Sequence, residues 1–130
     1  MYQATTHGID VTAEPFYLED QSDSDAGRHF WAYRITIRNG AALAVKLLTR
    51  HWIITDARGR VQEVRGDGVV GEQPELAPGD SYQYTSGCPL EATSGVMEGS
   101  YGMVLDDGSR ITVSIPAFSL DIPGRRAPLN

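Results

Sequence analysis

Cysteine is almost absent from the chain, since Cys88 is the single one among 130 residues. One cysteine cannot form an intramolecular disulfide, which favours a reducing compartment, and zinc sites built from C-x-x-C pairs are excluded. A catalytic thiol needs a base within reach and a depressed pKa, and the sequence indicates neither for Cys88. We therefore expect Cys88, just past the end of a predicted strand, to be a small buried apolar residue.

Long apolar stretches are also missing. The longest near-apolar run, residues 40–45, is far shorter than the about 20 residues that a membrane-spanning helix needs. The first eleven residues lack the charged start and apolar stretch of a signal peptide. We therefore expect a soluble cytoplasmic protein that does not interact with a membrane.

Basic residues are in the minority, with 11 Lys and Arg against 17 Asp and Glu and a net charge of -6. Such a surface repels phosphates, which disfavours nucleic acid and anionic membranes as partners. Arg125 and Arg126 form a short basic pair near the end of the chain. A pair of this kind is typical of a solvated terminus.

Helical periodicity is absent as well; residues 40–48 come nearest to it, and no cap ends them. The dominant apolar period is two, which is typical of half-buried strands. It is clearest in residues 29–38, where one face carries Trp31, Tyr33, Ile35 and Ile37. Further strands are predicted at Ile9–Tyr17, with Pro15 at a sheet edge, and at Val45–Asp56, Arg60–Arg65, Ser81–Ser86, Glu98–Leu105 and Arg110–Ile115.

Turn signals separate these strands at residues 56–59 and 106–109, and a polar loop is expected at 21–27. Pro78 and Gly79 suit a type II turn, anchored by Leu76 and Tyr82 on either side. The fold class that follows is all-β: an immunoglobulin- or fibronectin type III-like sandwich of seven or eight antiparallel strands. We expect a single domain, residues 1–130, with a core at about 9–120 and a short tail at 121–130.

One motif suggests a nucleotide site at first sight. Gly66, Gly68 and Gly71 have the G-x-G-x-x-G spacing of a dinucleotide-binding loop. That spacing binds a pyrophosphate when the third glycine opens a helix, whose N-terminus supplies free N–H groups. Pro74 follows closely and disfavours a helix, so we expect these glycines in a connection between strands.

Two interpretations of this connection remain open. Exposed N–H groups beside Arg65 can bind phosphate without a helix, and Arg50 and His51 in the neighbouring strand add positive charge. Asp67 and Glu72 lie in the same loop and oppose an anion. The simpler interpretation is that the glycines permit bulges and close backbone approach. The candidate ligand- or partner-binding residues are Arg50, His51, Arg65, Gly66, Gly68, Gly71 and Glu72.

Other chemistry has weaker support. The three histidines are far apart and share no metal-ligand spacing. The carboxylate pairs Asp23 with Asp25 and Asp106 with Asp107 suit a hard cation weakly, but such residues are typical of turns. Trp52 is expected in the core, which turns His51 to the opposite face of its strand. We predict no catalytic residue, no metal ligand and no cofactor.

Several stretches together resemble the ApaG family of small bacterial proteins. They are YRITIRN at 33–39, LTRHWIITD at 48–56, VQEVRGDGVVGEQP at 61–74, LAPGDSYQYTSGCPL at 76–90, GVMEGSYGMV at 95–104 and IPAFSL at 115–120. The resemblance covers nearly the whole chain. Its departures are mild, with Thr49 where serine is usual and Ile111 where phenylalanine is common.

The resemblance implies a fibronectin type III-like sandwich without an assigned enzymatic activity. Bacterial members have been linked to cobalt tolerance and magnesium efflux, and related domains in eukaryotic F-box proteins and a polymerase-interacting protein look like interaction modules. The leading hypothesis is a non-enzymatic binding module that acts through a protein partner and affects divalent-cation handling indirectly. The alternatives are a protein that binds phosphate, pyrophosphate or a dinucleotide at residues 65–71, and direct divalent-cation binding.

Overall fold

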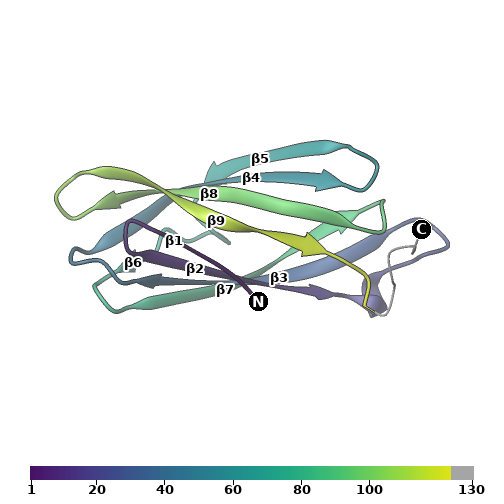
Figure 1. The fold of residues 1–130 in the computed structure, drawn as a ribbon, viewed down its shortest axis with the longest axis horizontal. Helices are drawn as coiled ribbons and strands as arrows, with labels where there is room; N and C mark the ends of the chain where they lie inside the picture. Colours follow the sequence, from purple (N-terminus) through teal and green to yellow (C-terminus); the bar gives the residue numbers. More distant parts are fainter. Residues whose placement is uncertain (124–130) are drawn as a thin grey trace.

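The computed structural model describes residues 1–123, which form nine β-strands and one short 3-10 helix (Figure 1). The strands are β1 Tyr2–Thr6, β2 Ile9–Tyr17, β3 His29–Asn39, β4 Val45–Asp56, β5 Val61–Asp67, β6 Glu75–Leu76, β7 Ser81–Leu90, β8 Gly95–Leu105 and β9 Arg110–Leu120, and the helix η1 is Glu19–Gln21. Within that part of the chain, no helix is long and apolar enough to span a membrane.

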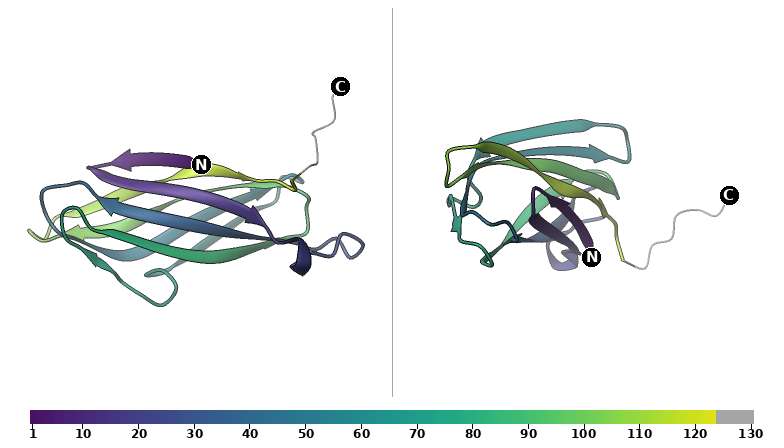
Figure 2. Two further views of the ribbon diagram at one scale, coloured as in Figure 1. Left: turned by 90° about the horizontal axis from the view of Figure 1, so that it is seen from below. Right: turned by 60° about the vertical axis from the view of Figure 1, so that its left-hand side comes forward.

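The strands form two packed antiparallel sheets, which Figures 1 and 2 show as separate layers. One sheet has the order β1-β2-β3-β7, and the other has the order β5-β4-β8-β9 with β6 beside the start of β4. The predicted all-β sandwich is therefore confirmed. Residues 40–44 form a bend before β4 and no helix, as the missing cap indicated.

The number of strands is nine, against the seven or eight expected, because β1 and β6 were not recognised. β1 is mostly exposed and has no clear alternation, while β6 has only two residues. β1 precedes the core expected from about residue 9, and Arg125 and Arg126 lie outside the described residues. β7 also continues to Leu90, so the expectation that Cys88 lies past a strand end is wrong.

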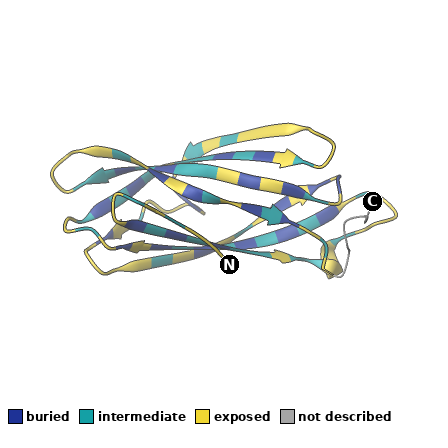
Figure 3. Cartoon of the chain, viewed as in Figure 1, coloured by how far each residue is buried: buried dark blue, intermediate teal, exposed yellow. Residues whose placement is uncertain are grey.

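The core lies between the two sheets, and buried positions alternate with exposed ones along most strands (Figure 3). Trp31, Tyr33, Ile35 and Ile37 are buried, as their common face predicted. The rings of Tyr33, Trp52 and Phe118 form a cluster across the sheets, with centroids 5.2 to 6.0 Å apart. Burial of large aromatic rings is the main source of stability in such a core.

Predicted turns occur where the backbone requires them. Gly79 has a φ of +90°, and the Asp80 N–H donates to the Ala77 carbonyl at 2.9 Å, which closes the turn before β7. Leu76 is buried beside this turn. Pro15 lies past Ala13, the last residue of β2 that pairs with β1, so it occupies a free edge as predicted.

The two sides of the sandwich differ. At the closed side β1 lies against β9, and the Ser114 N–H donates to Thr6 Oγ1 at 3.2 Å across the sheets. At the open side the edge strands are β5 of one sheet and β7 of the other. The glycine motif and its neighbours belong to the open side.

Candidate functional site

Arg50 lies on the inner face of its sheet, half-buried. A bulge at Leu48 shifts the register of β4, so that Arg50 shares the inner face with Trp52 and Ile54. Gly66 is opposite Arg50 in β5, and a Cβ at that glycine would lie 2.7–2.8 Å from the guanidinium atoms. Gly66 therefore provides the space that the Arg50 side chain occupies.

The Arg50 guanidinium binds the chain itself. Its Nη1 donates to the carbonyl oxygens of Asp67 at 2.9 Å and Gly68 at 3.0 Å. These carbonyls end β5 and begin the loop, so Arg50 holds the loop against the sheet. Charged hydrogen bonds of this kind are stronger than neutral ones.

Residues 68–72, which we call the glycine turn, form a second small hairpin. Val69 and Glu72 exchange both backbone hydrogen bonds, at 2.8 and 2.9 Å. The two residues between them, Val70 and Gly71, have φ of +43° and +83°, the signature of a type I′ turn. Val70 is a β-branched residue in the left-handed region, which strains the backbone, and its side chain is 56% exposed.

The glycine turn is also tied to β4. The Gly68 N–H donates to the Leu48 carbonyl at 2.8 Å, and the Gln73 side chain donates to the same oxygen at 3.0 Å. Gly68 has a φ of +63°, and a Cβ there would overlap the carbonyl oxygen of Glu72. The close backbone approach expected of these glycines is confirmed at this position.

His51 and Arg65 point to the outer face of the sheet, as the burial of Trp52 predicted for His51. There both contact Glu63: His51 Nε2 lies 3.0 Å and Arg65 Nη2 lies 3.3 Å from the same Glu63 oxygen. The hydrogen bond with His51, followed by that with Arg65, holds the pKa of Glu63 below its ordinary value. We call these three residues the outer cluster.

Glu63 was missed in the sequence, although a signal for it existed. The turn at residues 56–59 fixes the register of the β4–β5 hairpin, which pairs Ile53 with Glu63 and His51 with Arg65. Neighbouring pairs on one face of a sheet are within reach of long side chains. The predicted hairpin therefore already placed an acidic residue beside His51.

The structure thus divides the candidate residues among three places. Arg50 and Gly66 are on the inner face, while His51 and Arg65 are on the outer face of the same sheet. Gly68, Gly71 and Glu72 form the glycine turn beyond the end of β5. His51 and Arg65 on the outer face contact the Glu63 carboxylate, and the Arg50 guanidinium contacts backbone carbonyls.

Buried tyrosines lie near Arg50 in the core. The hydroxyl groups of Tyr84 on β7 and Tyr101 on β8 are hydrogen bonded across the two sheets. Burial raises the pKa of both tyrosines, and it raises that of Tyr33 against an opposing hydrogen bond with Ser86. These hydroxyls stay protonated at neutral pH, so they join the sheets as neutral hydrogen-bonding groups.

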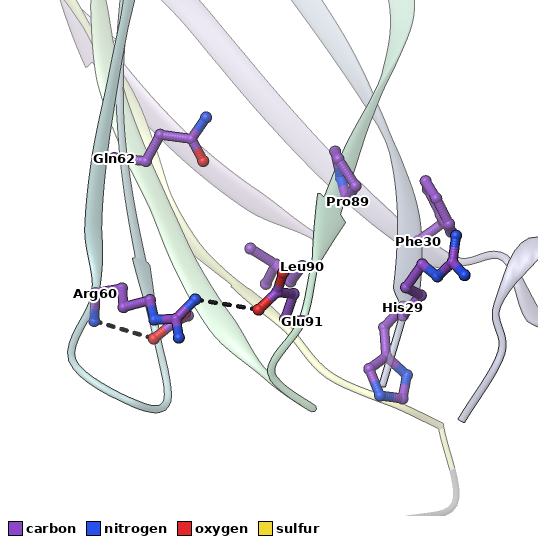
Figure 4. Close-up of a pocket in the computed structure, with 9 residues that line it drawn as sticks. His29, Phe30, Arg60, Gln62, Pro89, Leu90 and Glu91 are labelled. Carbon is purple, nitrogen blue, oxygen red and sulfur yellow. Dashed lines mark hydrogen bonds and ion pairs between the residues drawn. The ribbon is translucent and has the colours of Figure 1, made fainter. Parts of the chain in front are cut away.

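A pocket of about 360 Å³ opens at one end of the open side, between the β4–β5 hairpin and the end of β7 (Figure 4). Arg60 pairs with Glu91 at 3.1 Å across its mouth, and the Arg60 N–H donates to Asp56 at 3.0 Å. None of the candidate residues from the sequence lines it; the lining is Arg28, His29, Phe30, Asp56, Arg60, Gln62, Pro89, Leu90 and Glu91.

Cys88 is buried in β7, as expected of a small apolar residue. Burial raises the pKa of its thiol to about 11, which suppresses the reactive thiolate at neutral pH. Over residues 1–123, no three His, Cys, Asp or Glu side chains come together in a way that would hold a metal ion.

Comparison with known proteins gives a consistent result over the full length. The ApaG domain family matches residues 19–105. Protein ApaG of Brucella canis is 60% identical and that of Brucella anthropi is 62% identical, each over 130 residues and 100% of both chains. The crystal structure of the ApaA protein from Bordetella pertussis superposes with a TM-score of 0.88 and 44% identity, covering 90% of this chain and 95% of that one.

A more distant structure shows the fold alone. The C-terminal domain of wzt superposes with a TM-score of 0.51 at 9% identity, covering 98% of this chain and 88% of that domain. The same two-sheet arrangement therefore forms from a very different sequence.

Proposed function

The chain belongs to the ApaG family, and from that premise we propose that it is a non-enzymatic binding module that acts through a protein partner. The family resemblance links bacterial members to cobalt tolerance and magnesium efflux, and a module that acts through a partner affects divalent cations indirectly. The glycine turn is the surface that contacts the partner. In a cell this places the protein among those that bring other proteins together or regulate them.

The observation that carries this proposal is that the Arg50 side chain binds the backbone of its own chain. Its Nη1 donates to two carbonyls of its own chain, which fixes the glycine turn on the edge of the sheet. The turn then projects Val70, an apolar side chain that is 56% exposed, from an ordered backbone. A rigid projecting turn with an apolar tip suits a protein surface, because little ordering entropy is lost on binding.

The alternative of a phosphate, pyrophosphate or dinucleotide ligand at residues 65–71 has less support. The positive charge of Arg65 is shared with Glu63 at 3.3 Å, and Glu72 lies in the glycine turn itself. Direct cation binding has less support again, because the outer cluster combines its one carboxylate with an arginine. Neither alternative explains why the turn is held so firmly.

The test of the proposal is partner capture with a variant that keeps the turn. Val70→Asn removes the apolar tip while asparagine suits a type I′ turn, so the variant should be at least as stable as the wild type. Val96→Asn is the matched control, since Val96 is 42% exposed on β8 away from the turn. Tagged wild type and control should retain the same protein from a lysate, identified by mass spectrometry, and Val70→Asn should lose it.

A cell-based arm tests the link to cation handling. In a bacterium deleted for its ApaG protein, wild type and Val96→Asn should restore growth in cobalt, whereas Val70→Asn should not. Retention of both partner and cobalt tolerance by Val70→Asn would contradict the proposed surface.

Calorimetry tests the phosphate alternative separately. If residues 65–71 bind pyrophosphate, binding should be measurable at millimolar concentration in low salt, where charge attraction is least screened. Arg65→Ala should then weaken it by about 1.5–3 kcal/mol, the scale of a charged hydrogen bond. Without heat of binding for pyrophosphate or a dinucleoside polyphosphate, this alternative should be abandoned.

A further inference from the structure

The edge strand β5 presents a regular row of free backbone groups. The β4–β5 ladder has hydrogen bonds from the Asp56 N–H to the Arg60 carbonyl at 3.0 Å and from the Gly68 N–H to the Leu48 carbonyl at 2.8 Å. Hydrogen-bonded pairs alternate in an antiparallel ladder, so even-numbered residues of β5 bind β4. The N–H and C=O groups of residues 61, 63 and 65 therefore point away from the sheet, as does the Asp67 N–H, whereas the Asp67 carbonyl accepts a hydrogen bond from Arg50 Nη1 at 2.9 Å.

This edge lacks proline, which is one of the usual protections of a free edge. Proline blocks pairing at free edges, and it occurs at Pro89 in β7 and at Pro116 in β9. β5 contains no proline, has seven residues and is paired on one side by β4. Of the two edge strands on the open side, β5 is the one in which no proline removes a backbone donor.

The charged side chains of β5 are complementary to those of a second, antiparallel copy of the same strand. We propose that this edge pairs with the same edge of a second copy of the chain, antiparallel and with the two-fold axis at Val64. In this register Glu63 lies directly opposite Arg65 of the second copy, and the pair occurs twice. Both side chains are accessible on the outer face, with 53% and 72% of their surfaces exposed.

The backbone hydrogen bonds are compatible with this register. Antiparallel pairing requires the outward-facing residues of one strand to be opposite those of the other, and an axis at Val64 places 63 opposite 65 and 61 opposite 67. An axis at Glu63 or at Arg65 also satisfies the backbone, but it places two like charges directly opposite each other. The charges therefore discriminate among the registers that the hydrogen bonds allow.

The dimer joins two five-stranded sheets into one continuous sheet and buries a single edge of each chain. Interfaces of this size are weak and depend on concentration. The contact uses β5 and not Val70, so it is independent of the proposed function. Val70→Asn should retain the dimer even where it loses a protein partner.

Sedimentation velocity over a wide range of concentration tests the inference. The wild type should show a reversible monomer–dimer equilibrium. Glu63→Arg and Arg65→Glu should each raise the dimer dissociation constant about tenfold or more, because two attractive pairs become two repulsive ones. Both variants change exposed side chains, so circular dichroism should show the native fold in each.

A mixture of the two variants provides the decisive control. Glu63→Arg chains carry positive groups at both positions 63 and 65, and Arg65→Glu chains carry negative groups at both, so the mixture should form a heterodimer at the concentrations at which the wild type dimerises. Arg110→Glu, a reversal on β9, should leave the wild-type equilibrium unchanged. A wild type that stays monomeric up to its solubility limit, or a mixture that forms no heterodimer, would overturn the inference.

Discussion

The closed and open sides of the sandwich use their residues differently. At the closed side β1 lies against β9, and the ring of Tyr2 lies 6.1 Å from that of Phe118. At the open side β5 is mostly exposed, and the polar groups of Arg50, His51 and Glu63 gather around it. At the closed side, where the two sheets are in contact, residues serve mainly in packing. At the free edge of the open side, charged groups and backbone groups are available for binding.

The largest expected effect tests the packing side of this comparison. Phe118→Ala should lower the free energy of unfolding by about 3–5 kcal/mol, because it removes a fully buried ring from the aromatic cluster with Tyr33 and Trp52. Val61→Ala on β5, where the valine is 63% exposed, should cost about 0.5 kcal/mol or less. Urea denaturation measures both, and equal losses would remove the distinction between the two sides.

The second prediction separates structural from exposed charge at the open side. Arg50→Ala should lower stability by about 1.5–3 kcal/mol, because two backbone carbonyls lose a charged donor. Arg65→Ala should change stability by about 0.5 kcal/mol or less, since its side chain is 72% exposed. Urea denaturation of both variants measures these changes in stability. If Arg50→Ala were as stable as the wild type, the glycine turn would hold its position without the guanidinium.

A third, smaller effect tests the backbone of the glycine turn. Gly59→Ala, in open space at a φ of +82°, should cost about 1 kcal/mol from the left-handed conformation alone. Gly68→Ala should cost more, because the new Cβ would also overlap the Glu72 carbonyl. Thermal denaturation compares the stability of the two variants. Equal losses would show that the turn moves away from β4 with little loss of stability.

The smallest effect concerns the outer cluster. Because the folded-state pKa of Glu63 is lowered, its contribution to stability is present above the ordinary glutamate pKa of about 4.3 and is lost as the pH falls through the lowered value. Carbon-detected NMR titration should place the Glu63 midpoint below the ordinary glutamate value. His51→Ala should raise the Glu63 midpoint, and an unchanged midpoint would assign the shift to Arg65.

Much of the fold could be predicted because period-two patterns report directly on burial. The alternation in β3, the turn at Pro78 and Gly79 and the inward Trp52 each follow from local sequence. β1 could not be predicted, because its residues are mostly exposed and its partner in the other sheet, β9, is about a hundred residues away. β6 is too short for any pattern.

The candidate site was predicted in its parts more than in its arrangement. Pro74 correctly indicated that the glycines do not open a helix, and the structure shows a type I′ turn instead. The alternative of an anion site relied on positive charge from Arg65, Arg50 and His51, whereas Glu63 contacts both His51 and Arg65 in the structure. Which side chains meet across two strands depends on register, and one bulge or turn changes it.

The sequence by itself determined the class of fold, the absence of disulfides and the positions of the tight turns, because these depend on residue type and local spacing. The tertiary structure decided that Arg50 points inward and lies over Gly66, and that β5 is left as a free edge. The physical reason is that a bulge at Leu48 and the contact of β1 with β9 are long-range features. They arise from how whole strands pack, which no local pattern of residues contains.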